Sequence, residues 1–277
     1  MTDTAASHPA LSFAERLRAG EAFVGGWFSL PEVHFAEAVA ASPVSPIVLD
    51  VQHGLHDVAS IVSCVTAIAA AGKPALVRVS VGDFVLAARS LDVGAVGVIA
   101  PMIDTAEQAR AFAEQVKYPP RGRRSWGAGR AMSVLGGVEP PTYLREANDR
   151  TLALAMIETR EAVEAVEEIL AVDGIDGVFV GPNDLCIALT DGDRADTRDP
   201  ILNAALDRIV ATARAAGKIA GIFGGPAERA AAFRAKGFSF VTVGWDQMYV
   251  AAGIAAMLDE MEKTATSAGG SPGRTSD

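Results

Sequence analysis

The chain of 277 residues contains little cysteine, few aromatic residues and fewer basic than acidic side chains. Its two cysteines, Cys64 and Cys186, lack metal-site spacing and are too few for a disulfide framework, so both are expected to be reduced thiols. The formal net charge of −10 argues against nucleic acid and anionic membranes as partners, because both require clustered Lys and Arg. Without a secretory signal pattern or an uncharged apolar run of about 18 residues, a cytoplasmic protein is predicted.

Several nucleotide and metalloprotease motifs are also missing. The sequence has no G-x-G-x-x-G, no P-loop and no H-E-x-x-H. Dinucleotide, nucleoside triphosphate and zincin functions therefore have no support. Functional residues have to be sought in the positions that the fold gives them.

Short apolar runs alternate with longer Ala-rich helical segments along nearly the whole chain. Eight strands are predicted, at residues 23–30, 46–52, 74–80, 97–103, 151–158, 177–182, 219–225 and 240–246. Strict alternation with buried-type strands favours an α/β fold, a closed (β/α)8 TIM barrel, over an open doubly wound sheet. A single barrel domain is expected over residues 11–264. The ends, 1–10 and 265–277, are rich in small polar residues and are expected to be disordered.

Polar side chains follow several of these strands. They are Asp50, Gln52 and His53 after the second strand, Arg78 on the third, Glu158 after the fifth and Asp184 after the sixth. The carboxyl ends of barrel strands share one rim, so these groups are expected to converge. Glu158 and Asp184 offer hard oxygen ligands for a divalent cation of the magnesium or manganese kind. Such a cation and Arg78 would stabilise an oxyanion while His53 moves a proton, which suits enolate chemistry.

Each of these residues also has a simpler explanation. A histidine at a strand end is about as often structural as catalytic, and Arg78 could form a buried ion pair. Glu158 or Asp184 alone is more simply a helix-start carboxylate; their combination favours a site. The segment Gly181, Pro182, Asn183 and Asp184 could also bind a substrate carboxylate through backbone amides at a helix start.

The irregular stretch 119–149 is too long for a passive connection and is predicted to be a functional loop that leaves the catalytic rim after the fourth strand. It holds the densest basic cluster, Arg121, Arg123, Arg124 and Arg130. Such a cluster is either a solvated surface or a contact for a small anionic substrate or a neighbouring subunit.

Six segments in order along the chain resemble the HpcH/HpaI aldolases, also called 4-hydroxy-2-oxo-heptanedioate aldolases. They are LDVQHG (49–54), LVRVS (76–80), APM (100–102), PPRGRRSWG (119–127), MIETREAV (156–163) and GPNDL (181–185). The resemblance spans roughly residues 20–260. It implies a class II, metal-dependent pyruvate aldolase of the phosphoenolpyruvate/pyruvate barrel superfamily. It also implies a hexamer built as a trimer of dimers that exchange a helix.

The resemblance assigns roles to individual residues. Glu158 and Asp184 would bind Mg²⁺, Mn²⁺ or Co²⁺, which pyruvate chelates. His53 would be the acid/base residue, oriented by Asp50, and Arg78 would bind the keto or enolate oxygen and the aldehyde oxygen. The remaining assignments are Asp92, in support of the same proton network, and the loop with Arg123, Arg124 and Trp126, at the aldehyde site within the chain or across a subunit interface.

Two positions depart from the family pattern. Gln52 stands where many relatives have a glutamate, and Met156 stands where the best-known aldolases have a glutamine. The leading hypothesis remains reversible cleavage of a 4-hydroxy-2-oxo acid to pyruvate and an aldehyde, without a Schiff base, because the predicted strands carry no lysine. Two alternatives remain open: a lyase for a CoA thioester of the citramalyl or malyl type, and a catalytically silent barrel.

Overall fold

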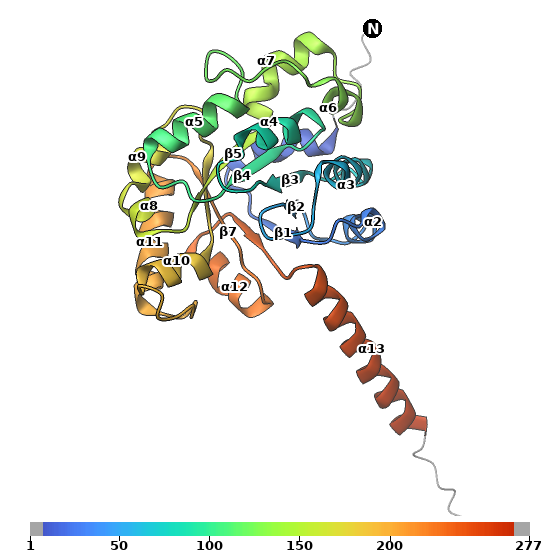
Figure 1. Cartoon of the computed structure of the whole chain (residues 1–277). Coiled ribbons are helices and arrows are strands. Elements are labelled where there is room, and N and C mark those ends of the chain that lie inside the picture. The colour runs from blue at the N-terminus through green and yellow to red at the C-terminus, as the bar shows by residue number, and fades with distance from the viewer. Residues whose placement is uncertain (1–7, 269–277) are drawn as a thin grey trace, which may run out of the picture.

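The computed structural model describes residues 8–268 and shows a closed barrel of eight parallel strands in sequential order (Figure 1). The strands are β1 (Phe23–Phe28), β2 (Ile47–Asp50), β3 (Ala75–Arg78), β4 (Gly97–Ala100), β5 (Leu152–Ile157), β6 (Gly177–Val180), β7 (Ile219–Ile222) and β8 (Phe240–Thr242). Each lies within one of the eight predicted segments, and the predicted (β/α)8 barrel is therefore confirmed.

Helices cover the outside of the barrel and connect the strands. They are η1 (Pro9–Ser12), α1 (Phe13–Arg18), α2 (Val33–Ala40), α3 (Val58–Ala70), α4 (Phe84–Asp92), α5 (Ala106–Val116), α6 (Gly129–Val134), α7 (Pro140–Arg150), α8 (Arg160–Glu164), α9 (Val166–Leu170), α10 (Pro182–Leu189), α11 (Pro200–Ala215), α12 (Ala227–Lys236) and α13 (Asp246–Ala268). Helix α5 begins in a capping box, in which the Thr105 hydroxyl accepts the backbone N–H of Gln108. At the end of α12, Gly237 adopts a φ of +106°, which glycine tolerates best.

Neighbouring residues of each strand point alternately into the barrel and toward the helices. Leu76 and Phe179 belong to the cluster that fills the barrel, whereas Val77 and Val178 belong to the cluster between barrel and helices. This period of two positions the polar residues at the carboxyl-terminal rim. Because the side chain of Leu76 points inward, the side chain of Arg78, two residues later on β3, also points inward.

The first described residues are ordered, contrary to the prediction. Residues 8–10 were expected to be disordered, but His8 Nε2 lies 2.9 Å from the carbonyl oxygen of Ala69, and Ala10 is buried. The rest of the predicted disordered ends, residues 1–7 and 269–277, lies outside the described residues. At the other end, residues 265–268 continue α13.

The position predicted for the 119–149 stretch is wrong. Helix α5 follows β4 and returns the chain to the amino-terminal face of the barrel before residue 119. The stretch contains α6 and most of α7, and α7 packs against α1, the helix that precedes the first strand. It therefore covers the face opposite to the catalytic rim.

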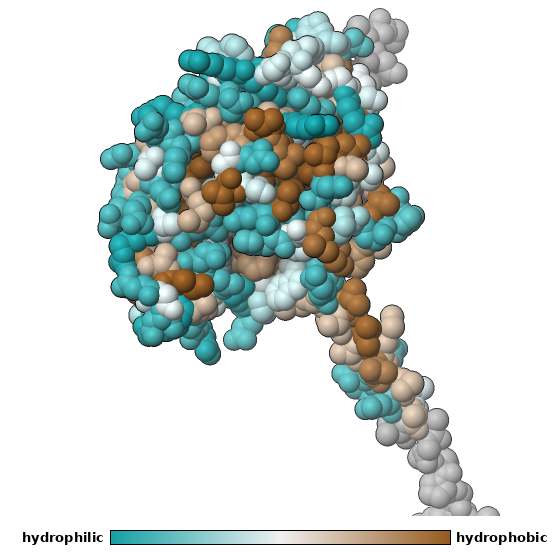
Figure 2. Space-filling model, viewed as in Figure 1, coloured by the Kyte–Doolittle hydropathy of each residue, from teal (hydrophilic) through white to brown (hydrophobic). Residues whose placement is uncertain are grey.

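The terminal helix α13 extends away from the barrel (Figure 1). Its first residue, Asp246, is buried and accepts the backbone N–H groups of Ser29 (2.7 Å) and Leu30 (2.6 Å). Brown, hydrophobic side chains run along the projecting helix (Figure 2). No helix within residues 8–268 has the length and apolar character needed to cross a membrane.

Candidate functional site

A cavity of about 540 Å³ opens at the carboxyl-terminal rim of the barrel. It is lined by Trp27, Ser29, Asp50, His53, Arg78, Met156, Gly181, Pro182, Asn183, Asp184, Phe223, Pro226, Arg229, Trp245 and Gln247. The structure thus brings together most of the residues that were predicted to share the rim. Ligand sites of (β/α)8 enzymes occupy this face.

Asp50 and Arg78 form a buried ion pair across neighbouring strands. They are register partners at the ends of β2 and β3, and each follows an inward-pointing residue by two positions. Arg78 donates from Nε to Oδ1 of Asp50 (2.8 Å) and from Nη2 to Oδ2 (2.6 Å). The guanidinium carbon lies 4.8 Å from the centre of the Trp27 ring, and Trp27 Nε1 donates to Oδ2 of Asp50 (3.3 Å). The buried ion pair considered for Arg78 is therefore real, but it lies inside the cavity.

His53 is exposed at the mouth of the cavity. Asp50 accepts the backbone N–H groups of Gln52 (3.1 Å) and His53 (3.3 Å). These hydrogen bonds stabilise the turn that carries the imidazole. Gly54 completes this turn, because a Cβ there would lie 2.1 Å from the carbonyl oxygen of Asp50. The contact of Asp50 with His53 thus runs through the main chain. The side-chain oxygen of Gln52 is buried without a partner among the described residues.

Glu158 and Asp184 meet where β5 and β6 end. Glu158 is 3% exposed, and its Oε2 accepts the backbone N–H of Met102 (3.1 Å), a residue held at a φ of +55°. Burial, and then the negative charge of Asp184, raise the pKa of Glu158 to about 7. The carboxylate of Glu158 can lie close to the backbone at residue 181 because that residue is glycine: a Cβ there would lie 2.3 Å from Oε1 of Glu158.

This pair fits a hard divalent cation. Its donors are carboxylate oxygens, and a positive ion between them would stabilise the ionised form of the buried Glu158 beside Asp184. No cluster of three or more His, Cys, Asp or Glu side chains suited to a metal occurs within residues 8–268. Glu158 and Asp184 would therefore supply two ligands and leave the other positions for substrate and water.

Four predicted residues, Asp92, Arg123, Arg124 and Trp126, lie away from the cavity of a single chain. Asp92 ends α4, and its Oδ1 accepts Nη2 of the buried Arg124 (2.6 Å). Trp126 packs against Tyr118 and Tyr143, with ring centroids 5.8 and 6.2 Å apart. Arg123 approaches Glu114, with Nε 3.9 Å from Oε2. All four belong to the amino-terminal face, and a role at the cavity remains a prediction only for a neighbouring subunit.

Sequence reasoning missed the aromatic wall and one arginine of the cavity. Phe223 and Trp245, at the ends of β7 and β8, and Trp27 on β1 were noted only as parts of apolar runs; a large ring at a rim position was the available signal. Trp27 and Phe223 meet edge to face, with ring centroids 5.0 Å apart. Arg229, in the first turn of α12, lies outside the predicted strands, and burial lowers its pKa.

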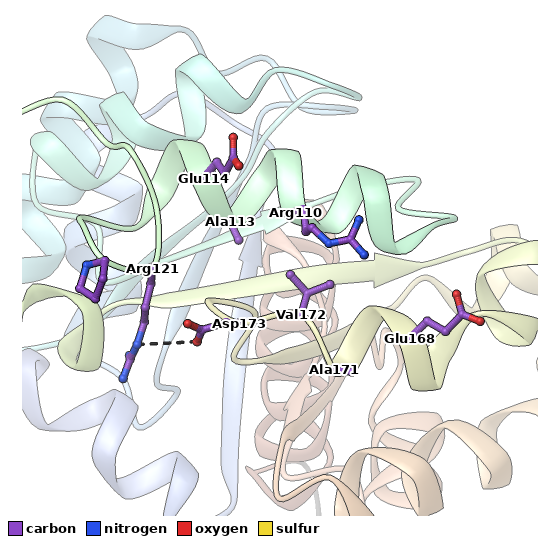
Figure 3. Close-up of a pocket in the computed structure, with 9 residues that line it drawn as sticks. Arg110, Ala113, Glu114, Arg121, Glu168, Ala171, Val172 and Asp173 are labelled. Atoms are coloured by element: carbon purple, nitrogen blue, oxygen red, sulfur yellow. Dashed lines mark ion pairs between the residues drawn. The ribbon is translucent and has the colours of Figure 1, made fainter.

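A second cavity of about 400 Å³ lies on the outside of the barrel, between α5 and α9 (Figure 3). Its charged lining residues carry both signs, and Arg121 Nε lies 3.8 Å from Oδ1 of Asp173. None of the residues predicted from the strand ends lines it. The cavity at the rim is therefore the candidate active site.

The chain is similar to known aldolases over most of its length. The family model HpcH/HpaI aldolase/citrate lyase matches residues 24–252. A hydroxypyruvate/pyruvate aldolase from Rhizorhabdus wittichii is 40% identical over 82% of this chain and 89% of its own length. A 4-hydroxy-2-oxo-heptane-1,7-dioate aldolase from Salmonella arizonae is 36% identical over 89% of this chain and 92% of its own.

Solved structures show the same relationship. A HpcH/HpaI aldolase/citrate lyase family protein from Burkholderia cenocepacia superimposes with a TM-score of 0.81 at 32% identity, over 91% of this chain and 99% of the other. The citrate lyase beta subunit from M. tuberculosis, solved with oxaloacetate and magnesium, shares the fold alone, with a TM-score of 0.52 at 20% identity over 83% of this chain and 93% of its own. This chain therefore belongs to the HpcH/HpaI aldolase/citrate lyase family and is a carbon–carbon lyase.

Proposed function

We propose that the protein is a metal-dependent, class II aldolase that reversibly cleaves a 4-hydroxy-2-oxo acid to pyruvate and an aldehyde. The observation that carries the proposal is the pair of Glu158 and Asp184, a buried carboxylate and a cavity-facing one at adjacent strand ends. No lysine lines the cavity among the described residues, which supports a route without a Schiff base. The names of the aldolase relatives support the same reaction class.

Glu158 and Asp184 would hold Mg²⁺, Mn²⁺ or Co²⁺. Bound there, the ion supplies positive charge that favours the enolate over the keto form of pyruvate. The start of α10 offers two backbone donors beside it, because first-turn N–H groups have no partner within the helix. Pro182 has no N–H, so Asn183 and Asp184 provide the amides for the pyruvate carboxylate.

Arg78 would bind a substrate oxygen, and His53 would transfer protons. Asp50 occupies Nε and Nη2 of Arg78, which leaves Nη1 for a substrate oxygen and fixes the guanidinium in place. In the cleavage direction, His53, directly or through a water, takes the proton of the 4-hydroxyl group, the C3–C4 bond breaks, and the aldehyde leaves. The electron pair of that bond forms the pyruvate enolate, which then gains a proton at C3.

Exchange of the pyruvate methyl protons in deuterated water tests this proposal without any aldehyde. The wild-type protein should exchange them only with a divalent metal, stop on addition of EDTA, and recover in a series of added metals. Glu158→Gln should lose exchange, and His53→Ala should lose most of it. Glu161→Gln, on the exposed side of α8, is the matched control. Metal-independent exchange, or full exchange by Glu158→Gln, would contradict the mechanism.

The terminal helix supports a proposal of assembly. Five apolar side chains of α13 are exposed at positions that share one helical face: Val250, Ile254, Met257, Leu258 and Met261. We propose that this face packs on a second copy of the chain through exchange of α13, within a hexamer. Leu258→Glu should yield a smaller species by native mass measurement, whereas Asp259→Asn, its neighbour, should not. A monomeric wild-type protein would contradict the assembly.

A further inference from the structure

The cavity contains two arginines that differ in their partners. Arg78 pairs with Asp50, but no carboxylate within residues 8–268 lies at ion-pair distance from Arg229. Arg229 instead donates from Nε to the carbonyl oxygen of Gly224 (2.5 Å) and from Nη1 to Oδ1 of Asn183 (3.1 Å). Both acceptors are uncharged, so neither of them neutralises the positive charge of Arg229 at the cavity wall.

The guanidinium of Arg229 packs against the backbone of Gly225. Gly225 has a φ of +65°, and a Cβ there would lie 2.1 Å from Nη2 of Arg229, so the side chain can take this position only because residue 225 has none. The ring of Phe223 lies on another side, 5.8 Å from the guanidinium carbon. Two hydrogen bonds, a ring and a bare backbone thus hold a half-buried charge. Partial burial without an opposite charge costs free energy, which an anionic ligand would recover.

The other charges of the cavity do not neutralise Arg229. Asp50 is taken by Arg78, and Glu158 with Asp184 balances a divalent cation in the proposed reaction. Pyruvate has its own amides at the start of α10. Arg229 stands on the β7–β8 side with Phe223 and Trp245, where the part of the aldehyde beyond its carbonyl group can extend.

We propose that Arg229 is a specificity-determining residue that binds an anionic group, a carboxylate or a phosphate, on the aldehyde substrate. The acid that the enzyme cleaves would then carry a second negative group at the end remote from its 2-oxo acid. This inference rests on the proposed aldol reaction. It goes beyond it by naming the class of aldehyde and the residue that selects it.

Matched pairs of aldehydes test the assignment in the metal-loaded enzyme. Succinic semialdehyde is compared with butanal, and glyceraldehyde 3-phosphate with glyceraldehyde, for kcat/KM in addition to pyruvate. The wild-type enzyme should prefer at least one anionic member, and which pair shows the preference separates carboxylate from phosphate. Arg229→Gln should reduce that preference about 10- to 100-fold, as expected for hydrogen bonds to a charged group. Arg229→Lys should retain part of it, and Arg234→Gln, an exposed position on the same helix, should retain all of it.

Each other result overturns the assignment. An equal loss for charged and neutral aldehydes in Arg229→Gln would show that Arg229 only supports Asn183. A parallel loss of pyruvate proton exchange would show that it binds the pyruvate carboxylate. A wild-type enzyme that exchanges pyruvate protons but shows no charge preference would contradict Arg229 as an anion site and leave the aldol reaction standing. Absence of exchange in the wild-type enzyme would instead contradict the aldol reaction itself.

Discussion

On the β2–β6 side of the cavity the charged side chains occur in pairs, whereas the β7–β8 side has aromatic rings and a single guanidinium with uncharged partners. Asp50 compensates Arg78, and Glu158 with Asp184 is suited to a cation. Within residues 8–268, Arg229 donates to an amide oxygen and a carbonyl oxygen and to no carboxylate. The difference indicates a division of labour: the paired side fixes the groups that every aldol cleavage needs, and the other side is available to select the aldehyde.

The largest expected effect tests whether the pairing on the first side is needed. Asp50→Asn leaves the guanidinium of Arg78, whose side chain is 7% exposed, without a carboxylate, which should lower the free energy of unfolding by about 3–5 kcal/mol. Asn183→Ala removes only a neutral partner of Arg229 and should cost about 1 kcal/mol. Denaturant unfolding of both variants measures the difference.

The double variant Asp50→Asn with Arg78→Met is the control for this prediction. It removes the charge together with its partner, so it should recover part of the lost stability. Equal costs for Asp50→Asn and Asn183→Ala would mean that the two arginines do not differ in the way the contacts indicate.

The next effect concerns the close packing of the carboxylate pair. Gly181→Ala would place a methyl group 2.3 Å from Oε1 of Glu158 and push the carboxylate away from Asp184. Metal affinity should fall about 10- to 100-fold, as for other residues that position metal ligands. Calorimetric metal titration measures it, and Gly129→Ala, where a Cβ meets nothing within 4 Å, is the control. Unchanged affinity would exclude Glu158 as a ligand in this geometry.

The carboxylate pair also predicts a pH dependence. In the metal-free protein the pKa of Glu158 is raised to about 7, so metal must displace a proton below that pH. Apparent affinity should fall about tenfold per pH unit below 7 and level off above it. Metal titrations between pH 5.5 and 8.5 measure this slope, and a flat profile would contradict it.

The same shift determines the sign for stability. Because the pKa of Glu158 in the folded protein is raised above its ordinary value of 4.5, its contribution to stability is present below about pH 4.5 and is lost as the pH rises through 7. The Tm of EDTA-treated protein should therefore contain a component that falls between about pH 4.5 and pH 7. The Glu158→Gln variant should lack this fall in Tm. Added metal should remove it as well, because the ion stabilises the ionised pair.

The sequence predicted the paired side of the cavity far better than the other side. Asp50, Arg78 and Glu158 stand at strand ends, and the period of two places each of them inward once the strands are located. The barrel itself follows from eight buried-type runs, all of which became strands. These features depend on local patterns that one sequence displays.

Other features depend on geometry that a local pattern does not carry. The 119–149 stretch was misplaced because α5 reverses the chain before it, so its arginines lie on the opposite face. Arg229 looked like any helical arginine; its position in the cavity depends on the open space at Gly225 and on the direction in which α12 leaves β7. The residues of the selective side had no motif to mark them.

The smallest expected effect tests how the selective side holds its guanidinium. Phe223→Leu removes the ring 5.8 Å from the guanidinium carbon of Arg229, and a cation–π contact of about 0.5–1 kcal/mol corresponds to about a two- to fivefold effect. The preference for anionic over neutral aldehydes should fall by that factor. Phe223→Tyr keeps the ring and should keep the preference. The ratio of kcat/KM for succinic semialdehyde and butanal measures it. A loss in Phe223→Leu as large as that in Arg229→Gln would mean that the ring positions the guanidinium, because the direct contact is too weak to account for it.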